Sequence, residues 1–437
     1  MQKVNKLRNE IIKLSGEYAK EVFEKKTDFI PGETHVPVSG KLIGNEEIKN
    51  AVDACLDGWF TSGRYVKKFE KEFSKFMNQR FCLLTNSGSS ANLLAVSALT
   101  SEKLGQKRLK PGDEVITVAT GFPTTTNPII QNNLIPVFVD ANLEDYSIDT
   151  KKLDKAMSPK VKAIMLAHTL GNPFNLDIIS EFRKKHNLWL IEDCCDAIGS
   201  TYNKKMVGTF GDISTASFYP AHHITMGEGG AVLTSNPKLK KIIESFRDWG
   251  RDCWCEPGVD NTCGKRFEWK IGELPHGFDH KYIYSHVGYN LKLTDMQAAI
   301  GLAQLEKIDF FIEKRNENYE FLYKSLLPLK KYIQLPVKTI NSKPSWFGFP
   351  IYVKNTSPIS RNDLVKNLDK SNIGTRLLFG GNLLKQPLYN GVKYRKSGQM
   401  VNSDKIMNNV FWVGTQPSLT KEMRQYIVDE LFRLINK

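Results

Sequence analysis

Short apolar runs alternate with stretches of helical periodicity between about residue 80 and residue 240. The apolar runs predict strands at Phe81–Thr85, Glu114–Val118, Ile135–Val139, Ala163–Ala167, Leu188–Ile191, Ile213–Phe218 and Ala231–Thr234. The periodic stretches predict helices at Ser90–Leu99, Ile178–Lys185 and Pro237–Phe246. Strands that alternate with helices indicate βαβ units, so we expect an α/β fold with a mostly parallel sheet covered on both faces.

Outside this region the pattern changes twice. Thr294 and Gln297 have the spacing of a capping box, and apolar residues then recur with helical spacing to Leu326, which predicts one long helix. After about residue 330 an α/β pattern returns, with a strand at Phe347–Val353 and a last helix from Thr420. We therefore expect an N-terminal helical extension (1–40), a large domain (41–325) with an inserted loop (250–285), and a small C-terminal α/β domain (326–437).

Composition excludes several classes of protein. The 437 residues are 41% hydrophobic and 11% aromatic, which excludes disordered and low-complexity chains. The uncharged stretch Val115–Val139 contains three prolines, so we reject a membrane span. The first 26 residues are charged throughout and lack the apolar core of a secretion signal, and they predict an amphipathic helix. We expect a cytoplasmic protein whose seven cysteines are free thiols or metal ligands.

The net charge of +14 is consistent with nucleic acid, anionic substrates or an acidic protein partner. The chain has no run of five basic residues, no zinc-finger or RNA-recognition motif, and no helix-turn-helix in its first 40 residues. We therefore expect no nucleic-acid partner.

Ligands of open α/β sheets bind beyond the carboxyl ends of the strands, where three segments contain reactive or small residues. The first predicted strand is followed by the sequence NSGSSA from Asn86 to Ala91, which opens a helix and suits a phosphate, although ordinary helix capping also explains it. Glu192–Asp196 (EDCCD) suits a metal, a base or a cofactor ring nitrogen. Ser217–Gly230 contains the adjacent histidines His222 and His223 and a glycine-rich end.

These three segments, together with DGWFTSGR at 57–64 and GYNLKLTDMQAA at 288–299, resemble the sugar-nucleotide aminotransferase family of the DegT/DnrJ/EryC type. The resemblance implies the aspartate-aminotransferase-like fold (fold type I), pyridoxal phosphate as cofactor and a homodimer. It also implies the cofactor-binding residues: Ser89, Ser90 and Ser217 at the phosphate, Phe122 stacked on the ring, Asp193 at the ring nitrogen, Asp196 near the ring hydroxyl, and Asn290 from the other subunit.

The chain departs from this family at the lysine that normally binds the cofactor covalently. His222 occupies the position of that lysine, and no lysine occurs between Met206 and Pro237. We therefore expect pyridoxamine phosphate to be held without a covalent bond, with His222 as the group that moves a proton. His223 is the alternative base.

Four cysteines make the second departure. Cys195, Cys253, Cys255 and Cys263 are separated by 57, 1 and 7 residues, a spacing that by itself leaves zinc and iron–sulfur equally open. Cys195 lies only two residues after Asp193, so a redox centre there would adjoin the cofactor. The other three cysteines are expected to pack as small apolar residues.

Both departures resemble the iron–sulfur-dependent 3-dehydrases of this family, in which four cysteines at this spacing hold a [2Fe-2S] cluster. The resemblance implies removal of the C3 hydroxyl of a nucleotide-linked 4-keto-6-deoxyhexose, with CDP as the expected nucleotide, in 3,6-dideoxyhexose and O-antigen biosynthesis. An NADH-dependent flavin/iron–sulfur reductase would supply the electrons. Substrate neighbours would be Tyr219 and Phe347, for which simple packing is the alternative, and Arg251 and Arg376 at the diphosphate.

Two other functions stay open from the sequence. One is a cluster-free dehydratase or aminotransferase-like protein whose cysteines bind structural zinc. The other is a cofactor-binding regulator that lost catalysis together with its lysine. In each case the positive charge is explained by anionic ligands: a cofactor phosphate, a sugar nucleotide and, for the dehydrase, an acidic redox partner.

Overall fold

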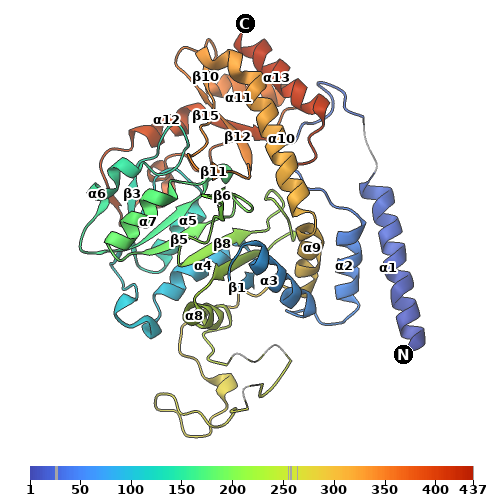
Figure 1. Ribbon diagram of the computed structural model, residues 1–437, viewed down its shortest axis with the longest axis vertical. Coiled ribbons are helices and arrows are strands. Elements are labelled where there is room, and N and C mark those ends of the chain that lie inside the picture. The colour runs from blue at the N-terminus through green and yellow to red at the C-terminus, as the bar shows by residue number, and fades with distance from the viewer. Residues whose placement is uncertain (25–27, 254, 256–257, 263, 437) are drawn as a thin grey trace.

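The structure is a computed structural model that describes residues 1–24, 28–253, 255, 258–262 and 264–436, and the statements below concern these residues. Its centre is an eight-stranded sheet (Figure 1). In spatial order the strands are β1 (Phe81–Thr85), β9 (Gly230–Thr234), β8 (Ile213–Ser217), β5 (Trp189–Asp193), β4 (Val161–Ala167), β2 (Glu114–Val118), β3 (Ile135–Val139) and β14 (Arg395–Lys396). Only β9 pairs antiparallel with its neighbours, so the sheet is mixed but mostly parallel.

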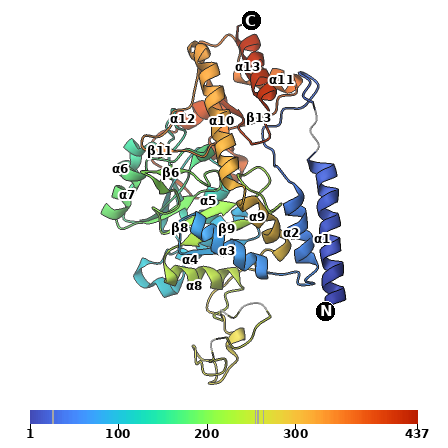
Figure 2. The same ribbon diagram turned by 45° about the vertical axis from the view of Figure 1, so that its right-hand side comes forward.

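Helices cover both faces of this sheet because its strands point apolar side chains to both sides. One face packs against α4 (Gly88–Leu99), α5 (Pro123–Gln131) and α8 (Pro237–Arg247). The opposite face packs against α3 (Arg64–Phe76), α6 (Leu153–Ala156), α7 (Leu176–Lys185) and α9 (Asp295–Leu305). At one side, α1 (Gln2–Phe23) lies along α2 (Asn45–Cys55), which in turn packs on α9 (Figure 2).

A second apolar core lies in the C-terminal part of the chain. It is formed by a four-stranded antiparallel sheet of β10 (Ile333–Gln334), β12 (Gly348–Val353), β15 (Val410–Gly414) and β13 (Thr375–Leu377). The helices α10 (Ile308–Leu326), α11 (Arg361–Lys370) and α13 (Lys421–Ile435) contribute the other side of this core. A small sheet of β11 (Ser342–Lys343), β6 (Thr201–Tyr202) and β7 (Lys205–Met206) joins the two parts.

The seven strands expected between residues 80 and 240 are all present, and their ends differ from the prediction by at most two residues. The fold class is therefore confirmed. The domain limits at 40 and 325 remain a proposal, because β14 and α12 (Val401–Asn409) belong to the C-terminal part and yet bond to the large sheet and to Asp140.

The prediction of one continuous helix from Thr294 to Leu326 is wrong. The capping box at Thr294 is present, but α9 ends at Leu305 and α10 begins at Ile308. The break is held from outside the helix, since the Lys307 ammonium lies 2.6 and 2.8 Å from the two carboxylate oxygens of Glu47 on α2. Glu47 is 1% exposed and needs a cationic partner. No glycine or proline marks the break, so the sequence pattern does not reveal it.

Two further features bear on the predictions. As expected, the N-terminus forms the amphipathic helix α1. Among the described helices none is both long enough and apolar enough to cross a membrane.

Candidate active site

The candidate site lies where β5 and β8 end, beside the start of α4. Asp193, the last residue of β5, is buried, and its carboxylate accepts hydrogen bonds from Asn92 Nδ2 (2.8 Å), Thr125 Oγ1 (2.7 Å) and the backbone N–H of Cys195 (3.1 Å). Three donors fix the orientation of this carboxylate. Asn92 and Thr125 were not identified from the sequence, because their role depends on α4 and α5 lying beside β5.

The N-terminus of α4 forms a polar cradle next to β8. Ser87 caps the helix by accepting a hydrogen bond from the Ser90 N–H (3.0 Å), and the side chain of Ser89 is exposed. Ser217 packs so closely that a Cβ at Gly88 would lie 2.4 Å from the Ser217 Cβ. The structure thus brings Ser89 and Ser90, at the N-terminus of α4, next to Ser217, and a helix N-terminus with nearby hydroxyl groups suits a phosphate. These residues fit the phosphate of the expected cofactor.

His222 lies in the loop after β8, close to a second carboxylate. Its Nδ1 is 3.6 Å from Asp196 Oδ1, longer than a hydrogen bond, and its ring centroid is 5.2 Å from that of Phe347. Tyr219 makes an edge contact with the imidazole at 6.5 Å and is itself half exposed. His223 points elsewhere and bonds the Ser345 carbonyl through Nε2 (3.0 Å), so His222 is the histidine that faces the carboxylates.

Desolvation shifts the pKa of both His222 and Asp196. Desolvation lowers the pKa of His222 to about 4, and the positive charge of Arg315 acts in the same direction while Asp193 opposes both. Desolvation and the nearby Asp193 carboxylate raise the pKa of Asp196 to about 7. At neutral pH His222 is therefore a neutral imidazole that can accept a proton, and Asp196 keeps its proton to a higher pH than an ordinary aspartate.

Arg315 of α10 lies behind His222, with 1% of its surface exposed. Its guanidinium donates to the backbone carbonyls of Phe347 (3.1 Å) and His222 (3.2 Å), and burial lowers its pKa to about 10. The side chain therefore ties the histidine loop to the loop before β12. The sequence contained a signal for this residue, because Arg315 occupies the apolar stripe of α10 between Phe311 and Tyr319.

Aromatic side chains lie at the start of α5, where Phe122 is the residue before the helix. Phe122 is 53% exposed, and its ring meets that of Phe379 edge to face at 6.1 Å. Its exposed surface leaves room for a ligand ring, and the stacking role of Phe122 stays a prediction. Phe379 was not identified from the sequence. Arg376 lies three residues earlier, is exposed on β13 and bonds the Thr375 carbonyl (2.8 Å).

Two predicted residues lie on the segments next to α8. Asn290 is exposed and pairs with Asp248 in an isolated β-bridge. The Arg251 guanidinium lies over the Trp249 ring at 5.0 Å, and Arg251 lines a cavity of about 260 Å³ together with Cys253.

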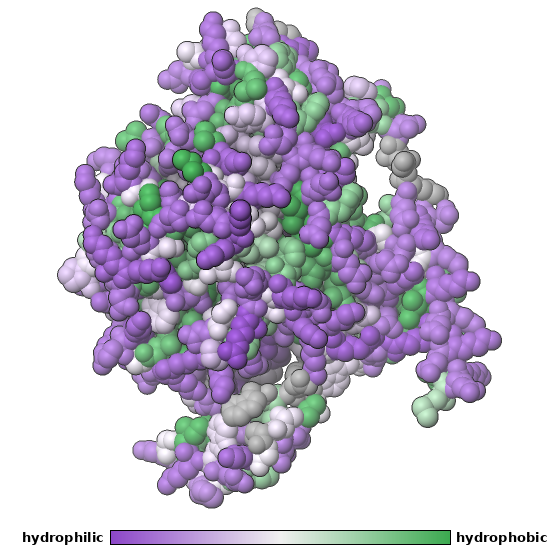
Figure 3. Space-filling model, viewed as in Figure 1, coloured by the Kyte–Doolittle hydropathy of each residue, from purple (hydrophilic) through white to green (hydrophobic). Residues whose placement is uncertain are grey.

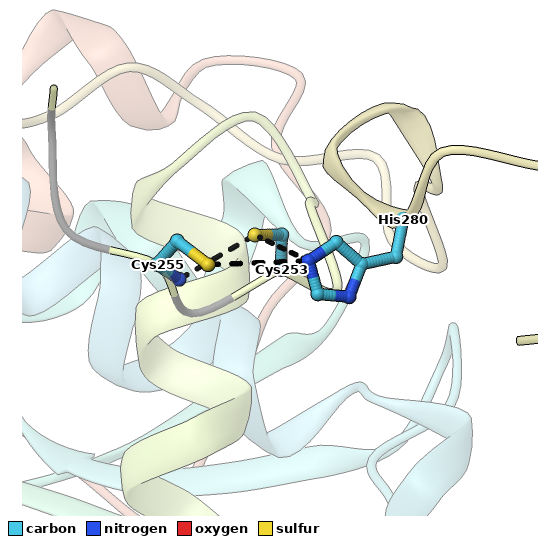
Figure 4. A group of neighbouring side chains, drawn as sticks. All are labelled: Cys253, Cys255 and His280. Atoms are coloured by element: carbon cyan, nitrogen blue, oxygen red, sulfur yellow. Dashed lines mark hydrogen bonds between the residues drawn. The ribbon is translucent and has the colours of Figure 1, made fainter. Parts of the chain in front are cut away.

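The predicted metal-binding cysteines are only partly brought together. Cys253 and Cys255 converge on His280, whose Nε2 is 3.3 and 3.9 Å from the two sulfur atoms (Figure 4). Among the described residues Cys195 is not part of this group. It stays at the end of β5 because its backbone bonds Asp193. Cys263 lies outside the described residues. His280 was not identified from the sequence, since it lies 25 residues beyond the cysteine pair.

The mostly parallel sheet and the polar site at its carboxyl edge define the aminotransferase-like fold type I of pyridoxal-phosphate enzymes. The structure of E. coli GDP-4-keto-6-deoxy-D-mannose-3-dehydratase with bound hydrated PLP superposes with a TM-score of 0.81, is 30% identical, and covers 91% of this chain and 99% of that chain. A structure of GDP-4-keto-6-deoxymannose-3-dehydratase with bound GDP-perosamine gives 0.82 at 29% identity, over 91% of this chain and all of that one (100%).

The model of the DegT/DnrJ/EryC1/StrS aminotransferase family matches residues 42–432, and the chain belongs to this family. It is similar to the lipopolysaccharide biosynthesis protein RfbH of Salmonella typhimurium, with 58% identity over 98% of this chain and 97% of that protein. It is also similar to dTDP-4-dehydro-2,6-dideoxy-D-glucose 3-dehydratase of Saccharopolyspora spinosa, with 51% identity over 95% of this chain and 89% of that protein.

Proposed function

We propose that the protein removes the C3 hydroxyl of a nucleotide-linked 4-keto-6-deoxyhexose, as a CDP-6-deoxy-L-threo-D-glycero-4-hexulose-3-dehydrase does. The observation that carries the proposal is the neutral, mostly enclosed His222 in place of the lysine that would bind the cofactor. Relatives named as 3-dehydratases, which are 51% and 33% identical to this chain, support this type of reaction. The resemblance to the lipopolysaccharide biosynthesis protein RfbH supports a role in lipopolysaccharide biosynthesis. Our proposal places the reaction in dideoxyhexose formation for the O-antigen, in the cytoplasm.

The cofactor of this proposal is pyridoxamine phosphate. When bound, it supplies an amine that condenses with the substrate ketone and a ring that accepts electrons. Ser89, Ser90 and Ser217 would hold its phosphate with the N–H groups of α4, and Phe122 would stack on the ring. Asp193, oriented by its three donors, would keep the ring nitrogen protonated. In the homodimer, Asn290 of the partner subunit would complete the phosphate site.

His222 would take a proton from the C4′ carbon of the cofactor as the C3 hydroxyl leaves. Its low pKa keeps the imidazole free to accept that proton at neutral pH. Asp196, with a pKa of about 7, is suited to share a proton with the cofactor hydroxyl. Tyr219 and Phe347 would enclose the reacting atoms, and Arg376 and Arg251 would contact the diphosphate of the nucleotide.

The reaction consumes two electrons, which we assign to an NADH-dependent flavin/iron–sulfur reductase acting through a [2Fe-2S] cluster. The cluster would be held by Cys195, Cys253, Cys255 and Cys263 and would pass electrons one at a time. Support comes from the convergence of the Cys253 and Cys255 sulfurs.

The same convergence favours a second candidate function. Two cysteines and a histidine within one loop are also typical ligands of structural zinc. In that case the protein would be a cluster-free dehydratase or an aminotransferase-like protein, and the reductase would not be needed.

Anaerobic purification followed by metal analysis and visible absorbance separates the two candidates. The dehydrase predicts iron and acid-labile sulfide in equal amounts; stoichiometric zinc without visible bands would instead support the second. Incubation with CDP-, dTDP- and GDP-linked 4-keto-6-deoxyhexoses, an NADH-dependent reductase and pyridoxamine phosphate then identifies the substrate. We expect a 3-deoxy product from the CDP sugar. No 3-deoxy product from any of the three sugars would refute the proposed reaction.

A further inference from the structure

The hydrogen bonds around Cys195 show where one ligand of the proposed metal centre lies in the fold. Its backbone N–H bonds Asp193 (3.1 Å), and the same carboxylate bonds Asn92 in the first half of α4 (2.8 Å). Cys195 therefore lies beside the N-terminal half of α4, within the cofactor site.

The Cys loop, residues 250–285, is fastened at the other end of α4. His286 at its base lies 2.7 Å from Ser101, which follows the C-terminus of α4. Asp252 forms an ion pair with Lys103, two residues further on. In both ribbon views the loop projects beyond α8, away from the sheet (Figures 1 and 2). Cys253 directly follows Asp252 and therefore lies near the C-terminal end of α4.

The two anchor points lie at opposite ends of α4, so this helix separates Cys195 from the start of the Cys loop. The seven residues from Asn92 to Leu99 alone correspond to about 10 Å of helix. Metal–thiolate bonds are about 2.3 Å long, so the sulfurs on one iron lie within a few ångström of each other. Cys195 is accordingly absent from the described group of Cys253, Cys255 and His280. Within the described part of a single copy, the ligand set of the proposed cluster is therefore incomplete.

The base of the Cys loop exposes an apolar surface. Val287 is 94% exposed, Tyr282 60% and Tyr284 50%, and Trp249 on the paired segment is also exposed. Hydrophobic side chains stand out among polar ones on the projecting loop in Figure 3. Such clustered apolar exposure marks a contact surface. Asn290, the residue assigned to the cofactor phosphate of the partner subunit, lies three residues from Val287.

We infer that the iron–sulfur centre is built between two copies of the chain, with Cys253 and Cys255 of one copy and Cys195 of the partner subunit as ligands. The inference rests on the proposed function, from which it takes the cluster and the homodimer. A second copy seated on the apolar surface supplies the missing thiolate, and each dimer holds two centres. The Cys loop of one subunit then serves the cofactor site of the other.

Mixed dimers test this arrangement directly. Cys195→Ala and Cys253→Ala chains, each with its own affinity tag, are co-expressed, and the mixed dimer is purified through both tags under anaerobic conditions. The shared centre predicts one intact site, that is, half of the wild-type iron and sulfide and half of its cluster signal in electron paramagnetic resonance. Centres within single chains predict no intact site, because each chain carries one defect.

The reciprocal mixed dimer must give the opposite result. A wild-type chain paired with a Cys195→Ala/Cys253→Ala chain loses both shared centres, whereas a centre within one chain would leave half the iron. A mixed dimer of Cys195→Ala with Cys55→Ala is the matched control and retains half under either arrangement, since Cys55 is exposed on α2 far along the chain from the Cys loop.

The outcomes separate this inference from the function on which it rests. Wild-type dimers without iron and sulfide would refute the redox function itself. The shared centre alone would be refuted if wild-type dimers contain clusters while the mixed dimer of one Cys195→Ala chain and one Cys253→Ala chain contains none. A monomeric wild-type protein with a full cluster would also refute it, as would a Cys195→Ala homodimer that keeps its iron. Binding of pyridoxamine phosphate, followed by absorbance, confirms that each variant is folded.

Discussion

Replacing Arg315 by methionine removes the buried guanidinium that holds the histidine loop. The variant leaves the carbonyls of Phe347 and His222 without their donors, which lie at 3.1 and 3.2 Å in the native protein. A buried carbonyl without a partner costs about 1–3 kcal/mol, so the two together cost about 2–6 kcal/mol. Removal of a buried charge offsets part of this cost. We expect a net loss of a few kcal/mol in the free energy of unfolding.

The same substitution has a functional consequence, because the His222 carbonyl belongs to the loop that positions the imidazole. We expect turnover of the 4-keto sugar to fall by at least about tenfold at temperatures where the variant is folded, since a misplaced base loses much of its contribution of about 10²–10⁴. The assays are urea unfolding followed by circular dichroism, and product formation with excess reductase.

Arg361→Met is the matched control. Arg361 is also buried and donates to two carbonyls, those of Val410 (2.9 Å) and Met407 (3.1 Å), in the C-terminal core. We expect a similar loss of stability without the loss of turnover per folded molecule. The reasoning about Arg315 fails if Arg315→Met keeps wild-type stability and turnover, or if both variants lose turnover equally.

The remaining predictions concern the role of His222, the serine site at the N-terminus of α4, stability at low pH, and the effect of salt on reduction. His222→Asn should reduce turnover by about 10²–10⁴ while pyridoxamine phosphate, followed by absorbance, stays bound; turnover at the wild-type rate would disprove its role as base. Gly88→Ala, whose Cβ would meet Ser217 at 2.4 Å, should weaken cofactor binding in a fluorescence titration. Burial raises the pKa of Asp140, but the donors Ser403 and Lys152 outweigh it and lower the pKa overall. The stability from Asp140 is therefore present above the unfolded pKa of about 3.9 and is lost as pH falls through the lower folded pKa; the difference in unfolding free energy between wild type and Asp140→Asn should shrink in that range. Reduction by the reductase should slow with added salt if the net charge of +14 attracts an acidic partner; a rate independent of ionic strength would argue against such steering.

Much of the site follows from where strands end. Asp193 and Ser217 are the last residues of β5 and β8, so the apolar runs alone indicate their location at one edge of the sheet. The residues that hold Asp193 could not be found in this way. Asn92 and Thr125 bond it only because two helices pack against a neighbouring strand, and the order of strands in a sheet is not written in any one segment.

Long-range polar contacts account for the other differences. The break after α9 depends on Glu47, more than 250 residues earlier in the chain, and Lys307 looks like any surface lysine in the sequence. The spacing of the cysteines predicts a metal centre, but it does not indicate that Cys195 and Cys253 are fastened at opposite ends of α4. That separation depends on tertiary contacts such as that between His286 and Ser101.

Helix α10 connects the His222 loop with the C-terminal core. Arg315 bonds the His222 loop, and Tyr319, one turn further along, stacks on Trp346 with ring centroids 3.8 Å apart. Trp346 precedes Phe347, whose carbonyl Arg315 also holds. Because Arg315 and Tyr319 lie one turn apart on α10, a change in packing at Trp346 would also reach the guanidinium that holds the His222 carbonyl.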